Sequence, residues 1–156
     1  MISSVEILLD NLQRYYSCSS YRSLSKKIPF SVNVVLNWSS GRTYPSIKQI
    51  DRIAFFIGID ASHLLIPDNC INIDTPPWKD RLNETIVYNL GKIKCEKALT
   101  ESTYPDNAGI TYRAFLYYLN GHISNLNLSK LDKLAIMLDV KPYQLLERRE
   151  TDYEKS

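Results

Sequence analysis

The sequence contains an internal duplication, because the segment from Ser20 to Leu65 recurs further along the chain in matched residue classes. The matched positions of the first copy are Ser20, Ser31, Trp38, Ser40, Gly41, Ala54, Ile59, Leu64 and Leu65. Those of the second copy are Thr100, Thr111, Tyr118, Asn120, Gly121, Ala135, Val140, Leu145 and Leu146. The offset is 80 residues up to Gly121 and 81 beyond it, so one residue is inserted in the loop that follows. A constant offset of this kind indicates a duplicated structural unit.

The duplication divides the 156 residues into two small units. We expect a first domain at 1–67, a Pro-containing linker at 68–80, a second domain at 81–149 and a polar tail at 150–156. Domains of about 65 residues bury only a modest core and are marginally stable on their own.

Apolar spacing and capping residues predict five helices in each unit, so the expected fold class is all-α. In the first unit these helices are expected at 5–16, 21–28, 32–39, 47–57 and, after an Asp60 cap, 61–66. In the second unit they are expected at 81–97, 100–109, 112–119, 128–138 and 142–147. Pro105 falls inside the second of these helices, where a proline costs roughly 3 kcal/mol, so this helix is expected to begin late.

The charges divide in the same way as the helices. The first unit carries seven Lys and Arg against four Asp and Glu, and the second carries ten against seven, which gives +3 for each. The linker and the tail each carry one Lys against three acids. Two mildly basic units with acidic connections suit contact with nucleic acid.

Several classes of function are disfavoured by what the sequence lacks. The three cysteines, Cys18, Cys70 and Cys95, form no C-x-x-C pair, which argues against a disulfide framework or zinc site and favours a reducing cytoplasm. His63 and His122 are the only histidines and have no partner at metal-ligand spacing. Because no signal peptide, membrane span, nucleotide-binding loop or hydrolase motif occurs, we expect a cytoplasmic protein with no membrane contact, metal, cofactor or catalytic site.

Each unit contains a short helix, a tight turn and a second helix with a capping hydroxyl, an order that is typical of a helix-turn-helix. The turns are Pro29-Phe30 and Gly109-Ile110. In the second helix of each motif an apolar pair at a spacing of three is expected to pack inward; the pairs are Val35 with Trp38 and Phe115 with Tyr118. Such a helix must project from the body to enter the major groove of DNA, which is about 12 Å wide.

The order of motifs resembles the lambda-repressor-like family of helix-turn-helix domains, also called the Cro/repressor or XRE family. The resemblance is carried by "NWSSGRTYPSIKQIDRIAFFIGIDASHLL" at 37–65 and "YYLNGHISNLNLSKLDKLAIMLDVKPYQLL" at 117–146, and it covers about four-fifths of the chain. It implies two tandem five-helix domains that bind specific sequences of double-stranded DNA. It also implies a transcriptional regulator, in particular a bacterial or phage repressor that occludes a promoter.

The resemblance further implies which residues contact DNA. At the start of the second helix the implied residues are Tyr21 and, in the second unit, Glu101. At the base-facing positions of the third helix they are Ser31, Val32, Asn33 and Asn37 in the first unit and Thr111, Tyr112, Arg113 and Tyr117 in the second. In the phosphate-contacting loop they are Ser40, Arg42, Asn120 and His122.

Departures from the family pattern leave alternatives open. Val32, Val34 and Leu36 are apolar, and such residues suit either thymine methyl groups in an A·T-rich site or a protein partner. In the second unit Arg113 suits guanine or phosphate, whereas Glu101 would repel phosphate. The alternatives are therefore a protein-interaction module (an antirepressor or an inhibitor of a host protein), a division with one unit on DNA and one on protein, and homodimerisation through the second unit.

Overall fold

A computed structural model of the chain describes residues 3–67, 82–106 and 108–148. The expected linker at 68–80, the expected tail at 150–156 and Cys70 lie outside these described residues. Within them the chain forms seven α-helices, two short 3-10 helices and no strand, which confirms the all-α class. We call residues 3–67 the N-terminal unit and residues 82–148 the C-terminal unit.

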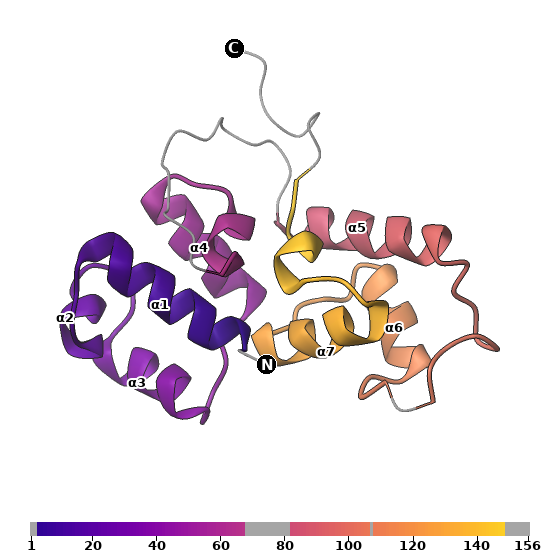
Figure 1. The fold of residues 1–156 in the computed structure, drawn as a ribbon, viewed down its shortest axis with the longest axis horizontal. Helices are drawn as coiled ribbons and strands as arrows, with labels where there is room; N and C mark the ends of the chain where they lie inside the picture. Colours follow the sequence, from indigo (N-terminus) through magenta and orange to yellow (C-terminus); the bar gives the residue numbers. More distant parts are fainter. Residues whose placement is uncertain (1–2, 68–81, 107, 149–156) are drawn as a thin grey trace, which may run out of the picture.

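The helices of the N-terminal unit are α1 (Ser4–Tyr16), α2 (Tyr21–Ser25), α3 (Val32–Ser40), α4 (Ile47–Ile57) and the 3-10 helix η1 (Ala61–Leu65). Those of the C-terminal unit are α5 (Leu82–Glu96), α6 (Tyr112–Leu119), α7 (Leu128–Leu138) and the 3-10 helix η2 (Pro142–Leu145). In Figure 1, α3 lies below α1 at the left end of the body and α6 lies below α5 at the right end, with α4 and α7 between them.

Side-chain caps set most of the helix starts. The side chains of Ser20, Ser31, Ser46 and Thr111 each accept a hydrogen bond from the backbone N–H three residues further on, as the sequence predicted. These bonds satisfy N–H groups that have no partner inside the helix. Asp60 differs from the prediction, because its side chain makes no capping bond to η1 and lies buried against the other unit.

The prediction of a helix between Thr100 and Gly109 is wrong. The described residues 97–106 and 108–111 contain only turns, one of which is closed by a bond from Thr103 N–H to the Thr100 carbonyl (3.1 Å). The chain leaves α5 through Ala98 in the left-handed region (φ 49°), and Pro105 removes a backbone donor. The C-terminal unit therefore has four helices in its described residues, and not the five expected.

An aromatic side chain takes the place of that missing helix. The Tyr104 ring lies edge-on to Tyr112, with centroids 5.1 Å apart, and 6.0 Å from the centroid of Phe115. Its hydroxyl donates to the Ile110 carbonyl, which fixes the turn that leads into α6. In the N-terminal unit the corresponding support comes from α2, whose Leu24 is fully buried.

Two buried asparagines reveal that the duplication extends to the first helix of each unit. The amide of Asn11 on α1 donates to the carbonyls of Leu64 (3.0 Å) and Ile66 (2.9 Å). The amide of Asn89 on α5 donates to the carbonyls of Leu145 (2.9 Å) and Glu147 (2.8 Å), which are the counterparts of Leu64 and Ile66 in the repeat. Asn11 thus connects α1 to the C-terminal end of η1, and Asn89 connects α5 to the C-terminal end of η2.

The two units pack against each other around a local pseudo-two-fold axis. Ser46 and Asn127, the N-caps of α4 and α7, lie opposite each other in an antiparallel bridge. The Ile47 N–H donates to the Leu126 carbonyl (3.2 Å) and the Leu128 N–H donates to the Pro45 carbonyl (3.0 Å). These two bonds are equivalent, because Leu128 is the repeat counterpart of Ile47 and Leu126 is that of Pro45.

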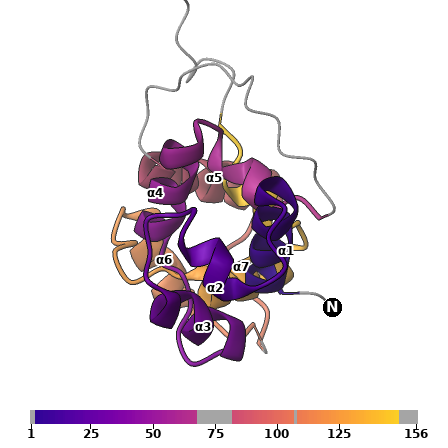
Figure 2. The ribbon, with the colours of Figure 1, turned by 90° about the vertical axis from the view of Figure 1, so that its left-hand side faces the viewer.

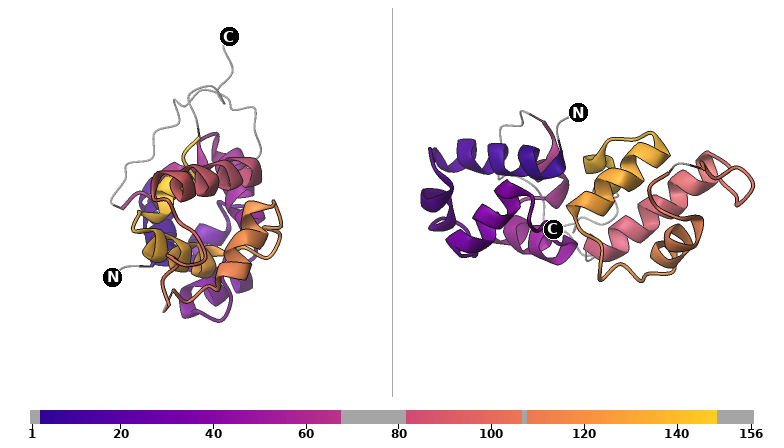
Figure 3. Two further views of the ribbon diagram at one scale, coloured as in Figure 1. Left: turned by 90° about the vertical axis from the view of Figure 1, so that its right-hand side faces the viewer. Right: turned by 90° about the horizontal axis from the view of Figure 1, so that it is seen from below.

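Further from the bridge, helices of one unit pack on helices of the other: α1 on α7, α4 on α5 and η1 on η2. The apolar side chains of both units form one continuous core. Figure 2 and Figure 3 show the same arrangement from the sides and from below.

A buried arginine crosses from one unit to the other. The side chain of Arg148 is fully buried, with Nε 3.4 Å from Asp60 Oδ1 and Nη2 3.6 Å from Asp51 Oδ1. Its Nη1 donates to Thr85 Oγ1 (3.2 Å). Burial raises the pKa of Asp51, as does the neighbouring Asp60, while Arg148 acts to lower it.

The counterpart of Asp51 in the C-terminal unit is Asp132, and its partner across the interface is Ser4. Asp132 accepts hydrogen bonds from the backbone N–H of Ser4 (3.0 Å) and from the Ser4 hydroxyl. Burial raises the pKa of Asp132, and both bonds from Ser4 act to lower it. The pseudo-symmetry therefore holds for the backbone bonds of the bridge and the helices that meet there, but not for the charges that join the two units.

Candidate nucleic-acid interface

Helix α3 rests on an aromatic and apolar support. Val35 and Trp38 are buried, as the sequence predicted, and the Phe30 ring lies edge-on to Trp38 with centroids 5.2 Å apart. The guanidinium of Arg52 lies over the Phe30 ring, 5.4 Å from its centroid. This support turns the opposite face of α3 toward solvent.

The solvent face of α3 carries the residues expected to contact bases. Asn33 is exposed, Leu36 is 42% exposed, and Val32 and Asn37 are half-buried. Ser31 is also exposed, and its hydroxyl accepts the Val34 N–H at 3.4 Å. The face therefore offers one exposed amide, one half-buried amide and apolar groups.

The loop after α3 holds the expected phosphate contacts. Gly41 takes the left-handed conformation (φ 78°) that ends the helix, and such a conformation disfavours any residue with a Cβ. The Ser40 hydroxyl donates to the Asn37 carbonyl at 3.2 Å, and the Arg42 N–H donates to the same carbonyl at 3.0 Å. The Arg42 side chain remains exposed beside the end of α3.

Helix α6 has the same construction with different side chains. Phe115 and Tyr118 are buried and the Thr111 hydroxyl accepts the Ala114 N–H at 3.1 Å. Arg113 is exposed, whereas Tyr112 is half-buried in the aromatic cluster with Tyr104. Of the residues expected to contact bases here, Tyr112 thus serves mainly to support the helix.

An open hollow lies between α6 and the loop that follows it. The ring of Tyr117, 56% exposed, stacks on His122 with centroids 4.3 Å apart and planes 20° from parallel. Arg113 and Lys130 also line this hollow, so cationic side chains flank the stacked pair. Asn120 is exposed close by and ends α6 through its N–H bond to the Leu116 carbonyl.

Tyr21 and Glu101, the residues expected to contact DNA at the start of the second helix of each unit, lie in different surroundings. Tyr21 follows the Ser20 cap of α2 and is half-buried against the core. Glu101 is exposed in the turn of the C-terminal unit, where it and Asp106 line a shallow hollow beside Thr111. This places negative charge next to the start of α6, a charge with no counterpart at α3.

Two basic residues lie beside the turns that precede α3 and α6, and one of them, Arg52, was not predicted as a site residue. Lys133 is exposed on α7, and the aliphatic part of its side chain lies close to Gly109, in the turn before α6. Arg52 is exposed on α4 beside Phe30, in the turn before α3. The two are counterparts in the repeat, as "DRIA" at 51–54 and "DKLA" at 132–135 show. A basic residue recurring at this position was the sequence signal for them.

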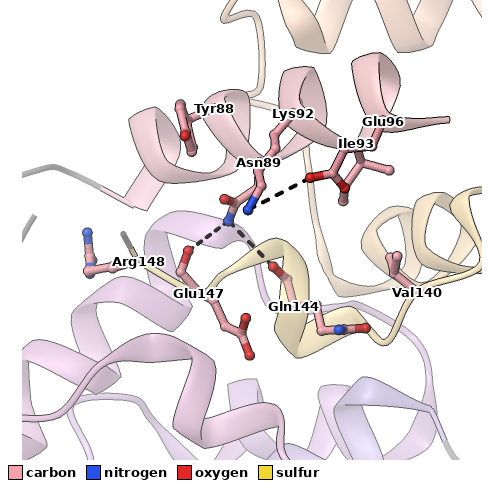
Figure 4. A pocket seen from close by; sticks show the side chains of 9 residues that line it. All are labelled: Tyr88, Asn89, Lys92, Ile93, Glu96, Val140, Gln144, Glu147 and Arg148. Atoms are coloured by element: carbon pink, nitrogen blue, oxygen red, sulfur yellow. Dashed lines mark hydrogen bonds and ion pairs between the residues drawn. The ribbon is translucent and has the colours of Figure 1, made fainter. Parts of the chain in front are cut away.

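A further hollow lies on another part of the C-terminal unit, between α5 and η2 (Figure 4). It is lined by polar and charged side chains, among them Lys92 and Glu96, whose charged atoms are 3.9 Å apart. The Asn89 amide at its wall is engaged by backbone carbonyls. Burial raises the pKa of Glu147, as does Asp60, while Lys92 and His63 act to lower it.

Across the described ranges, no group of three or more His, Cys, Asp or Glu side chains is placed to hold a metal ion. None of the helices in the described part of the chain has the length and apolar character needed to cross a bilayer. Comparison of the chain with protein-family models, curated proteins and solved structures gave no significant match.

Proposed function

We propose that the chain is a transcriptional regulator that binds specific sequences of double-stranded DNA. Its N-terminal unit would act as a helix-turn-helix similar to the lambda-repressor-like family, and its C-terminal unit as a related unit in which Tyr104 supports α6 in place of the first helix. The observation that carries this proposal is the matched pair of helices α3 and α6. Each rests on two buried side chains, exposes a hydrogen-bonding side chain in its first turn, and lies on the same side of the body as the other (Figures 1 and 3). We call α3 and α6 the recognition helices.

The exposed side chains of the recognition helices match the chemistry of base edges. Asn33 on α3 presents an amide that can bond adenine at two atoms, and the exposed part of Leu36 suits a thymine methyl group. Arg113 on α6 presents a guanidinium that can bond guanine at two atoms. Contacts of this type discriminate between base pairs, so they would give the protein its sequence preference.

Exposed or half-buried cations surround the recognition helices and would hold the DNA backbone. Arg42 follows α3, Arg52 and Lys133 lie at the turns before α3 and α6, and Lys130 lines the hollow beside α6. Phosphate contacts position a protein on the duplex and are insensitive to sequence. Bound in this way, the chain would cover a promoter and exclude the polymerase, which is the mechanism of a repressor.

The dependence of DNA affinity on salt tests this proposal. Each phosphate contact releases counterions, so log affinity should fall against log salt with a slope of about −0.9 per contact. Fluorescence anisotropy with a pool of genomic duplexes, at several salt concentrations, measures this slope. The absence of binding at the lowest salt concentration would overturn the proposal.

A second candidate function is a protein-interaction module, such as an antirepressor or an inhibitor of a host protein. It is favoured by the apolar exposure of the recognition helices, where Leu116 is 37% and Tyr117 is 56% exposed. On α4, Phe55 and Phe56 are 79% and 57% exposed. This candidate predicts no DNA binding in the salt titration. A division of labour, with one unit on DNA and one on protein, predicts binding that depends on only one recognition helix.

A further inference from the structure

We infer that a single chain, without a second copy, binds a non-palindromic DNA site composed of two unlike half-sites. This inference rests on the proposed function and specifies its DNA. It is carried by the contrast between a symmetric pairing of the two units and two different recognition helices.

The scaffold already contains the two-fold pairing that two separate copies would otherwise have to form. The Ile47 N–H is bonded to the Leu126 carbonyl and the Leu128 N–H to the Pro45 carbonyl, both within one chain. The surfaces around this bridge are also buried within the chain, because α1 packs on α7 and α4 packs on α5. A second copy therefore finds this interface occupied.

The pairing also fixes the relative position of the two recognition helices. The fully buried Arg148 side chain lies within ion-pair distance of Asp60 and Asp51 across the interface, and Ser4 bonds to Asp132 on the other side of the axis. One apolar core runs through both units. Dimeric helix-turn-helix proteins, whose two recognition helices are related by a two-fold axis, bind half-sites about 10 base pairs, or one turn of DNA, apart, and we expect the same spacing here.

The two recognition helices differ at the positions that face solvent. Asn33 of α3 corresponds to Arg113 of α6, and Asn37 corresponds to Tyr117. Leu36 and Leu116 are identical counterparts, so the difference lies in the hydrogen-bonding residues. Because asparagine favours adenine and arginine favours guanine, one half-site is expected to centre on A·T pairs and the other on a G·C pair.

Selection of bound duplexes from a random library by the full-length chain tests the inference. We expect the enriched sequences to contain two unlike elements at one fixed spacing of about 10 base pairs. Native mass spectrometry of the selected duplex should then show one chain per DNA molecule.

Two matched variants assign the elements to the units. Both residues are exposed and neither caps a helix, so N33A and R113A should fold as the parent does. We expect N33A to lose preference in the A·T element alone and R113A in the G·C element alone, each by roughly 5- to 150-fold against the preferred base. If the chain instead bound as a homodimer on a palindrome, each variant would alter both elements equally.

The outcomes separate the inference from the proposed function. A palindromic motif bound by two chains, or a single element with no second half, would overturn the inference while DNA binding itself stood. Failure to enrich any sequence, with no binding at low salt, would overturn both. Two unlike elements bound by one chain, each altered by a different variant, would support both.

Discussion

Ser46 and Asn127 lie opposite each other across the pseudo-two-fold axis, and each caps its own helix while its backbone neighbours bond to the other unit. The Ser46 hydroxyl accepts the Gln49 N–H at 3.1 Å and the Asn127 side chain accepts the Lys130 N–H at 3.0 Å. The same two residues thus set where α4 and α7 begin and where the two units meet. Helix starts and the interface are consequently coupled at one point of the chain.

The buried Arg148 is expected to dominate the stability of the interface. R148M would leave Asp60, which is 1% exposed, without the counter-charge that faces it. We expect a loss of roughly 3–5 kcal/mol in the free energy of unfolding, because removing one partner of a buried ion pair is strongly destabilising. Urea denaturation followed by circular dichroism measures it. As a control, K92M breaks the exposed pair with Glu96 and should cost no more than about 0.5 kcal/mol; equal losses in the two variants would refute the expectation.

The two buried asparagines should contribute equally to stability. N11A leaves two backbone carbonyls of a 3-10 helix region without their amide donor, and N89A leaves three, the third being the longer bond to Gln144 (3.5 Å). We expect each to cost about 1–3 kcal/mol, as removal of a buried partner usually does. N33A, at an exposed site, is the matched control and should change stability by less than about 0.5 kcal/mol. A large effect in only one of the two units would argue against their equivalence.

Stability should respond to pH through Asp132. Since burial raises its folded-state pKa above the ordinary 3.8, its contribution is complete below that value and is lost as pH rises through the raised pKa. The advantage of the parent over D132N should therefore shrink between pH 4 and pH 7. Urea midpoints of both proteins across this range measure the trend, with the exposed D139N as a charge-matched control. A widening advantage toward neutral pH would contradict it.

Substitution of Pro105 tests whether the segment between α5 and α6 is a turn or the expected helix. In the turn that the structure shows, P105A should lower the free energy of unfolding by less than about 1 kcal/mol, because the proline restricts the unfolded chain. Inside a regular helix the same change would instead stabilise by roughly 3 kcal/mol. Thermal denaturation distinguishes the two cases by the sign of the shift.

Arg52 and Lys133 should act alike on DNA. R52A and K133A each remove one cation at the turn before a recognition helix, so each should weaken binding to all sequences about equally and reduce the salt slope by about 1. K92A, in the hollow between α5 and η2, should leave the slope unchanged. A change in sequence preference in either variant would show that the residue contacts bases rather than phosphate.

Local signals predicted much of the fold. The caps Ser31, Ser46 and Thr111, and the inward pairs that support α3 and α6, follow from short-range spacing and lie where expected. The failure at the described residues between Thr100 and Gly109 has a tertiary cause, because the Tyr104 ring, and not a helix, packs against Tyr112 and Phe115. No periodicity encodes such a substitution.

The interface between the units was beyond sequence reasoning for a different reason. In the sequence, Asp60 stands where a helix cap is expected. Arg148 stands near the end of a domain, where a solvated residue is expected. Their pairing depends on how two units meet in space, which a pattern within one unit does not contain. For the candidate site, the sequence placed Asn33 and Arg113 on exposed faces correctly, but it missed Arg52, whose role depends on packing against Phe30.

The position of Arg148 in the chain has a consequence for biosynthesis. Asp51 and Asp60 emerge from the ribosome long before the guanidinium that lies against them, and Ser4 likewise precedes Asp132. Chains grow at about 5–20 residues per second, so the N-terminal unit spends several seconds with these groups unmatched. The nascent first half therefore cannot complete its native contacts until the residues that carry Asp132 and Arg148 have been synthesised and have left the ribosome.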